Sequence, residues 1–298
     1  MTVGNTGPLS DVELVLDAHA DLGEGPTWDL VAQQLLWVDI TAGVVHRFDP
    51  ATGKTGSIDV GQPVGAAVPT SSGRVALAVK DGFSILDLVT EGVTRVADVE
   101  VGVPETMMND GKVDPAGRFW AGTKDIEGRR PLGSLYRFDA NHTVVPVVSG
   151  VTISNGLGWS PDQRLMYYID SPSHGIDVFD FEMEDGSVSG RRRLVDLPKE
   201  WGLPDGMTLD KEGFFWVAFW GGGAVRRIAP DGCVVSVVTL PVSQVTSCAF
   251  GGEDLLDLYV TTARSGLGSV QLREQPYAGG LFRFRPEVPG VAEHPFIG

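Results

Sequence analysis

Cysteines, basic residues and long apolar runs are all scarce in this chain of 298 residues. Its two cysteines, Cys233 and Cys248, are too few for a disulfide framework and do not suit a zinc–thiolate cluster. Lys and Arg number 23 against 39 Asp and Glu, and the net charge of −16 argues against a nucleic-acid partner, because phosphate binding needs clustered cations. No stretch approaches the roughly 20 apolar residues of a membrane span.

Several sequence signatures are missing as well. The N-terminal segment has neither the basic region nor the continuous apolar region of a signal peptide, so we expect a cytoplasmic protein with no membrane partner. There is no G-x-S-x-G motif of a serine hydrolase and no H-x-x-x-H spacing. The sequence does not predict an oligomeric state.

What the chain does contain is an internal repeat. The segment "DKEGFFWVAF" near residue 216 resembles "DPAGRFWAGT" at 114–123 and "SPDQRLMYYID" at 160–170, with further copies along the chain. The aligned repeat position recurs every 39 to 48 residues and is occupied by Trp37, Ala76, Trp120, Tyr168, Trp216 and Tyr259.

The repeat predicts an all-β protein. Each copy is followed by a second strand pattern that ends in turn residues, such as "VVHRFDPATG" from residue 44, which is typical of a hairpin. Several strands in a period near 40 to 48 residues favour a propeller, whereas parallel β-helix repeats are much shorter. We therefore predict one six-bladed β-propeller domain over residues 1–298. A strand at about 12–18 should close the last blade.

Four repeats carry an oxygen-bearing side chain where the innermost strand begins. Asp205 and Asn109 lie eleven residues before the repeat position, and Asn155 and Glu24 lie thirteen before it. Asp and Asn before Gly are common turn residues, so one such motif alone would indicate only a turn. Their recurrence at one repeat position favours a functional site.

Equivalent ends of innermost strands share one rim of the channel, so Glu24, Asn155 and Asp205 should converge there. Two carboxylates and an amide oxygen facing one another would repel or stay unsatisfied without a cation. A bound divalent ion resolves this conflict. The hard oxygen ligands favour Ca²⁺, Mg²⁺ or Mn²⁺, with Zn²⁺ also possible.

Longer motifs carry a resemblance to a known family. "NDGKVDPAGRFWAGT", "ISNGLGWSPD", "LPDGM", "TSCAFGG" and "QPYAGGLFRF" resemble the regucalcin (senescence marker protein), gluconolactonase and luciferin-regenerating enzyme family. The resemblance runs from residue 22 to about 284. It implies a six-bladed propeller and a metal, with calcium favoured, held by Glu24, Asn155 and Asp205.

The resemblance also implies substrate contacts from Asn109 and from Glu127. The chain departs from the family pattern at one position of this site. Members that act on sugar lactones carry Arg two residues before the Asn, and this chain has Met107 there. Arg offers up to five hydrogen-bond donors, while Met offers only an apolar surface, so we expect Met107 to form an apolar wall of the substrate site.

These observations predict a metal-dependent hydrolase of a small, sugar-like lactone, with the lactone as its small-molecule partner. Asp205 is the candidate general base, and the metal would polarise the ester carbonyl. Two alternatives stay open. One is a propeller that binds calcium or a ligand without catalysis, and the other is an esterase or lactonase acting on a less polar biosynthetic substrate.

Overall fold

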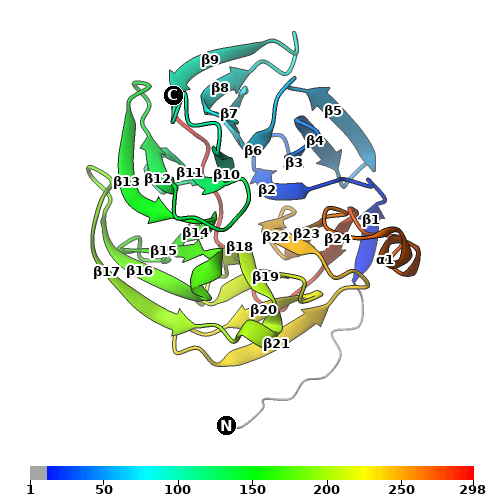
Figure 1. The fold of residues 1–298 in the computed structure, drawn as a ribbon. Helices are drawn as coiled ribbons and strands as arrows, with labels where there is room; N and C mark the ends of the chain where they lie inside the picture. The colour runs from blue at the N-terminus through cyan, green and yellow to red at the C-terminus, as the bar shows by residue number, and fades with distance from the viewer. Residues whose placement is uncertain (1–11) are drawn as a thin grey trace.

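The computed structural model describes residues 12–298. Residues 1–11, which hold much of the segment for which the sequence predicts no signal peptide, lie outside the described residues. The described chain forms 24 strands, arranged as six antiparallel sheets of four strands each. Figure 1 shows the six sheets arranged like blades around one central axis. The predicted six-bladed β-propeller is confirmed.

The strands of the first five blades follow the chain from the innermost strand outward. The blades are β2 (Gly23–Asp29), β3 (Gln34–Asp39), β4 (Val44–Asp49) and β5 (Lys54–Asp59); β6 (Val64–Pro69), β7 (Val75–Val79), β8 (Gly82–Leu86) and β9 (Val93–Asp98); β10 (Thr106–Val113), β11 (Phe119–Asp125), β12 (Gly133–Phe138) and β13 (Val144–Val151); β14 (Ser154–Trp159), β15 (Leu165–Asp170), β16 (Gly175–Glu182) and β17 (Ser187–Asp196); and β18 (Leu203–Leu209), β19 (Phe215–Trp220), β20 (Ala224–Ile228) and β21 (Val234–Thr239).

The sixth blade joins the two ends of the described chain. It consists of β22 (Val245–Gly251), β23 (Asp257–Thr262) and β24 (Leu281–Phe284), with β1 (Glu13–Leu16) paired to β24 as the outermost strand. Because a strand from one end of the chain completes the sheet from the other end, the ring of blades is closed. Only one short α-helix, α1 (Ser269–Glu274), occurs in the described part of the chain. None of the helices formed by residues 12–298 has the length and apolar character needed to cross a lipid bilayer.

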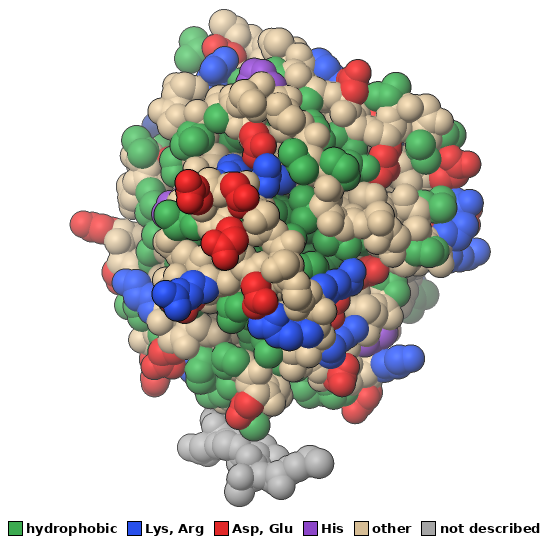
Figure 2. Space-filling model, turned by 90° about the vertical axis from the view of Figure 1, so that its left-hand side faces the viewer, with side chains coloured by type: hydrophobic (Ala, Val, Ile, Leu, Met, Phe, Trp, Pro, Cys, Tyr) green, Lys and Arg blue, Asp and Glu red, His purple; other side chains and the backbone are tan. Residues whose placement is uncertain are grey.

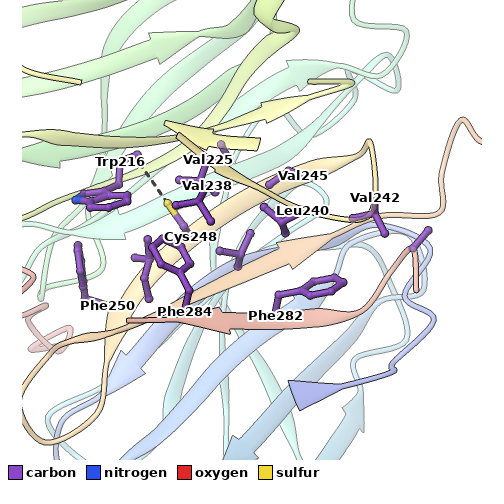
Figure 3. Packing of buried hydrophobic residues seen from close by; sticks show 14 residues of the cluster. Trp216, Val225, Val238, Leu240, Val242, Val245, Cys248, Phe250, Phe282 and Phe284 are labelled. Carbon is purple, nitrogen blue, oxygen red and sulfur yellow. Dashed lines mark hydrogen bonds between the residues drawn. The ribbon is translucent and has the colours of Figure 1, made fainter. Parts of the chain in front are cut away.

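Apolar side chains fill the space between neighbouring blades. The residues of the predicted repeat position all lie on the second strand of a blade and are at most 1% exposed. Figure 3 shows the contact between the fifth and sixth blades, where Trp216 lies across from Phe250 and Phe284. In the same cluster the thiol of Cys248 donates a hydrogen bond to the carbonyl of Trp216 at 3.2 Å. Burial of this kind, between blades distant in sequence, stabilises the ring.

The outer surface is charged but mixed in sign. Figure 2 shows the side of the propeller on which β13 and β17 lie, with acidic and basic side chains interspersed among apolar ones. No extended basic patch covers that face.

The C-terminal segment crosses one end of the central channel, behind the innermost strands in Figure 1. Its backbone N–H groups donate to four blades: Gly290 to Leu255, Val291 to Leu209, Phe296 to Pro69 and Ile297 to Gly117, at 2.8 to 3.1 Å. These contacts lie at or beyond the C-terminal ends of the innermost strands, so this end of the channel is covered. The sequence did not predict this covering.

Each of the six innermost strands carries an irregularity of pairing at the same place. The register with the second strand shifts between Glu24 and Thr27 in β2, between Asn155 and Leu157 in β14, and between Pro204 and Met207 in β18, and the other three innermost strands shift likewise. A β-bulge leaves a residue unpaired and re-aims its side chain. The bulges therefore release the rim residues from the regular alternation of the sheets.

Glycines next to the bulges allow the innermost strands to approach one another closely. A Cβ added to Gly65 would collide with the backbone of Asn109, and one added to Gly156 would lie 2.8 Å from the carbonyl oxygen of Asp205. Glycine in a strand often marks such an approach of another backbone. The repeated Gly after the rim residues is therefore a packing requirement of the ring.

We expect Gly65→Ala to lower the free energy of unfolding by about 1–3 kcal/mol, because overpacking against a backbone cannot be relieved by a side-chain rotation. Urea unfolding followed by circular dichroism measures the change. Gly92→Ala is the matched control, since the nearest atom to its added Cβ is the Thr90 hydroxyl at 3.2 Å and the residue is exposed and lies outside the strands. Equal stability of the two variants would contradict the close-approach interpretation.

Candidate functional site

A cavity of about 240 Å³ opens at the end of the channel where the innermost strands begin. The polar residues that line it come from five blades and are Glu24, Asn109, Lys124, Asn155, Ser171, Asp205 and Ser265. Leu22, Ile153, Leu203 and Trp220 supply apolar wall. The structure thus brings Glu24, Asn155, Asp205 and Asn109 together at one rim. The carboxylates and amides among them are only 3 to 6% exposed.

A hydrogen-bond network orients the two amides. Asn109 Nδ2 donates to the carbonyl oxygen of Ser154 at 2.8 Å and to Asn155 Oδ1 at 3.0 Å. Asn155 Nδ2 donates to Ser171 Oγ at 2.7 Å. Because its nitrogen is held by Ser171, Asn155 keeps its oxygen on the side of Asn109 and the cavity. The Ser171 partner was not predicted from the sequence, since it lies after β15 at the start of a short 3-10 helix (Ser171–Ser173).

The two carboxylates are held in an environment that disfavours their charged forms. Burial, with a further contribution from the charge of Asp110, raises the pKa of Glu24 to about 8, although the N–H of Gly25 donates to its Oε2 at 2.9 Å. Burial and the charges of Glu24 and Asp110 hold the pKa of Asp205 well above its usual range. Both shifts come chiefly from burial of the carboxyl groups, and nearby negative charges add to them.

Lys124 is a part of this site that the sequence did not predict. It lies near the end of β11, the second strand of its blade, whereas the predicted rim positions all lie on innermost strands. Burial lowers its pKa, and the charges of Glu24 and Asp205 oppose that shift. The signal from which Lys124 could have been predicted is the pairing of β10 with β11, which places Lys124 directly opposite Met107.

Two residues predicted to contact substrate do not line the cavity. Met107 is 9% exposed and packs in a cluster with residues of the first two blades, including Val38 and Val64. Glu127 lies in the turn after β11, with its side chain 67% exposed and Arg129 at 3.7 Å. Their roles toward substrate stay predictions. A substrate held within this cavity would not contact either side chain.

The donor set at the rim fits a hard divalent cation. Glu24 and Asp205 contribute carboxylate oxygens and Asn155 an oriented amide oxygen, the ligand types that Ca²⁺ and Mg²⁺ prefer. A dication would also stabilise the charged forms of both carboxyl groups, which burial and nearby negative charges disfavour. Across residues 12–298 no cluster of three or more His, Cys, Asp and Glu side chains is arranged for a metal, and here the third donor is an amide.

Fold and cavity together define a class of protein: a six-bladed propeller with an acidic, oxygen-lined site at the open end of its channel. Comparison with known proteins narrows this class. Residues 22–264 match the family described as "SMP-30/Gluconolactonase/LRE-like region". The chain belongs to this family.

Its relatives match over almost their whole length. Regucalcin of Xenopus laevis is 42% identical over 96% of this chain and 98% of its own. A Bacillus subtilis protein, "Putative sugar lactone lactonase YvrE", is 38% identical over 97% of this chain and 99% of its own. A solved structure of a calcium-binding regucalcin from Agrobacterium tumefaciens superposes with a TM-score of 0.94 at 28% identity, covering 99% of each chain. That of a luciferin-regenerating enzyme gives 0.90 at 33% identity, covering 98% and 100%.

The ion-free protein should lose stability as the pH rises from about 4.5 to 8. The unfolded chain releases the Glu24 proton near the ordinary value of 4.5, while the folded protein retains it up to about 8. Stability from this group is therefore complete below pH 4.5 and is lost as the pH rises toward 8. Thermal melts in chelator across this range should show a smaller loss for Glu24→Gln than for the wild type. A larger loss in that variant would contradict the assignment.

Adding Ca²⁺ or Mg²⁺ to the ion-free protein should raise its Tm. Binding to the folded state alone stabilises it by about 2.7 kcal/mol at a hundredfold excess over Kd. We expect this shift to vanish in Glu24→Gln and Asp205→Ala. It should persist in Asp231→Ala, because Asp231 is an exposed turn residue that accepts from the N–H of Cys233. A full shift in Asp205→Ala would place the ion elsewhere.

Proposed function

We propose that this protein is a divalent-metal-dependent hydrolase of small, sugar-like lactones. The observation that carries the proposal is the convergence of two buried carboxylates and an oriented amide oxygen on one cavity. Membership of a family that includes gluconolactonases, and the similarity to a protein named as a sugar lactone lactonase, support the reaction class. Glu24, Asn155 and Asp205 would hold the ion, with calcium favoured.

When bound, the ion would supply a Lewis acid that polarises the ester carbonyl. Asp205 is the proposed general base, because it is buried and faces the cavity. Its carboxylate takes a proton as a water oxygen bonds to the carbonyl carbon of the lactone. The ring C–O bond then breaks, the ring oxygen receives the proton, and the product is an open-chain hydroxy acid.

Asn109 is proposed to orient the substrate. Both of its hydrogen bonds within the protein use the amide nitrogen, so its side-chain oxygen can accept from a substrate hydroxyl. Trp220 and the neighbouring apolar wall would cover part of the ring and exclude water from it.

A second candidate function is calcium binding without catalysis. The names of the relatives favour it, since several are called regucalcin and one solved structure is described as a calcium-binding protein. Such a protein would use the same three ligands and turn over no lactone.

An assay of glucono-1,5-lactone hydrolysis separates these candidates. The acid released is measured by titration at constant pH. We expect activity with Ca²⁺, Mg²⁺ or Mn²⁺ and its loss on chelation. Asp205→Asn should lower kcat by about 10²- to 10⁴-fold, the usual contribution of a general base. Asp231→Asn is the control and should keep wild-type activity.

Ion binding by a protein that hydrolyses neither glucono-1,5-lactone nor a less polar lactone would favour the second candidate. Unchanged kcat in Asp205→Asn would remove this residue from the reaction.

A further inference from the structure

The ammonium group of Lys124 has no direct partner among the residues that the structure describes. It lies partly buried in the wall of the same cavity as Glu24 and Asp205. Among residues 12–298 no hydrogen bond or ion pair is made by its ammonium, and the two carboxylates act on it only through their charge. Its three N–H donors are therefore left for something that enters the cavity.

A second lysine of the channel, Lys112, has direct partners, so the lack of a partner among the described residues is specific to Lys124. Lys112, on β10, lies 2.9 Å from Glu293 and donates to the carbonyl oxygen of Met207 at 3.2 Å. Lys112 thereby helps to hold the C-terminal segment across the covered end of the channel. A buried cation that only stabilises the fold is paired in this way, and Lys124 is not.

Lys124 lies next to Met107, the position at which family members that act on sugar lactones carry Arg. Its ammonium could therefore take the place of that Arg. The two residues are direct partners in the antiparallel pair β10–β11, and opposed side chains leave a sheet on the same face. Met107 packs in the cluster against which Leu22 also packs, and Leu22 lines the cavity. Lys124 therefore lines the cavity beside the position of Met107, whose own side chain packs in the apolar cluster outside it.

We infer that Lys124 is a substrate-binding, specificity-determining residue whose ammonium donates hydrogen bonds to oxygen substituents of the lactone. The inference rests on the proposed hydrolase function. A divalent ion would balance the charges of Glu24 and Asp205, which leaves Lys124 as excess positive charge in the cavity. Such a cavity favours a polyhydroxylated lactone, and its hydroxy-acid product, over an unsubstituted ring.

The test compares Lys124→Met and Lys124→Arg with the wild type on glucono-1,5-lactone and on δ-valerolactone. Lys124→Met should lower kcat/KM for the polyhydroxylated lactone about ten- to hundredfold, the usual effect of an unpaired buried hydroxyl. For δ-valerolactone the change should stay below about threefold, since that ring offers no hydroxyl. Lys124→Arg should restore much of the loss. Lys54→Met, at an exposed position of β5, is the control.

Two further measurements need no turnover. Lys124→Met should bind the divalent ion about three- to tenfold more tightly, because the ammonium no longer competes for the carboxylate charge. It should bind gluconate about tenfold more weakly in isothermal titration. A side chain that only supports the fold would alter neither affinity in this pattern, and circular dichroism verifies that the variants are folded.

The outcomes separate the inference from the function on which it rests. If the wild type hydrolyses both lactones and Lys124→Met slows both equally or neither, the inference is wrong and the hydrolase function stands. If the wild type hydrolyses neither, the proposed function fails. In that case gluconate binding decides, and equal affinity in the wild type and Lys124→Met overturns the role of Lys124 as well.

Discussion

The close approach of six innermost strands around a single channel is the constraint on which the rest of this structure depends. Glycines beside the bulges let one strand lie against the backbone of the next, as Gly156 does against Asp205. Bulges at the same place in each strand turn side chains out of the regular alternation. As a result, residues more than a hundred positions apart in sequence face one small cavity.

The electrostatics of the site follow from that geometry. Burial raises the pKa of both Glu24 and Asp205, and the charge of Glu24 adds to the shift at Asp205. Among residues 12–298, Lys124 is the one cation that lines the cavity. Such an arrangement is costly for folding in the absence of an ion and suits the binding of one. Structures of this kind place instability at the functional site and compensate for it elsewhere. Here the compensation is the apolar packing between blades and the closure of the ring by β1.

The two ends of the channel differ in how their polar groups are paired. At one end the C-terminal segment bonds to four blades, and Glu293 pairs with Lys112, so these groups are paired within the protein. At the other end the polar groups of Asn155, Asp205 and Lys124 face the cavity. These are the donors and acceptors that a ligand entering the cavity would meet.

The sequence by itself determined the number of blades, because the repeat position recurs with the period of a four-stranded unit and its aromatic residues must be buried. It also determined that Glu24, Asn109, Asn155 and Asp205 share a rim, since equivalent positions of repeated strands lie at equal heights on one axis. Only the tertiary structure decided which further side chains reach the cavity. Lys124 and Ser171 lie on other strands and loops, and the positions of Met107 and Glu127 depend on how the ends of β10 and β11 pack. Periodicity determines the height of a residue along the axis, whereas the direction of its side chain depends on contacts between blades that no local pattern encodes.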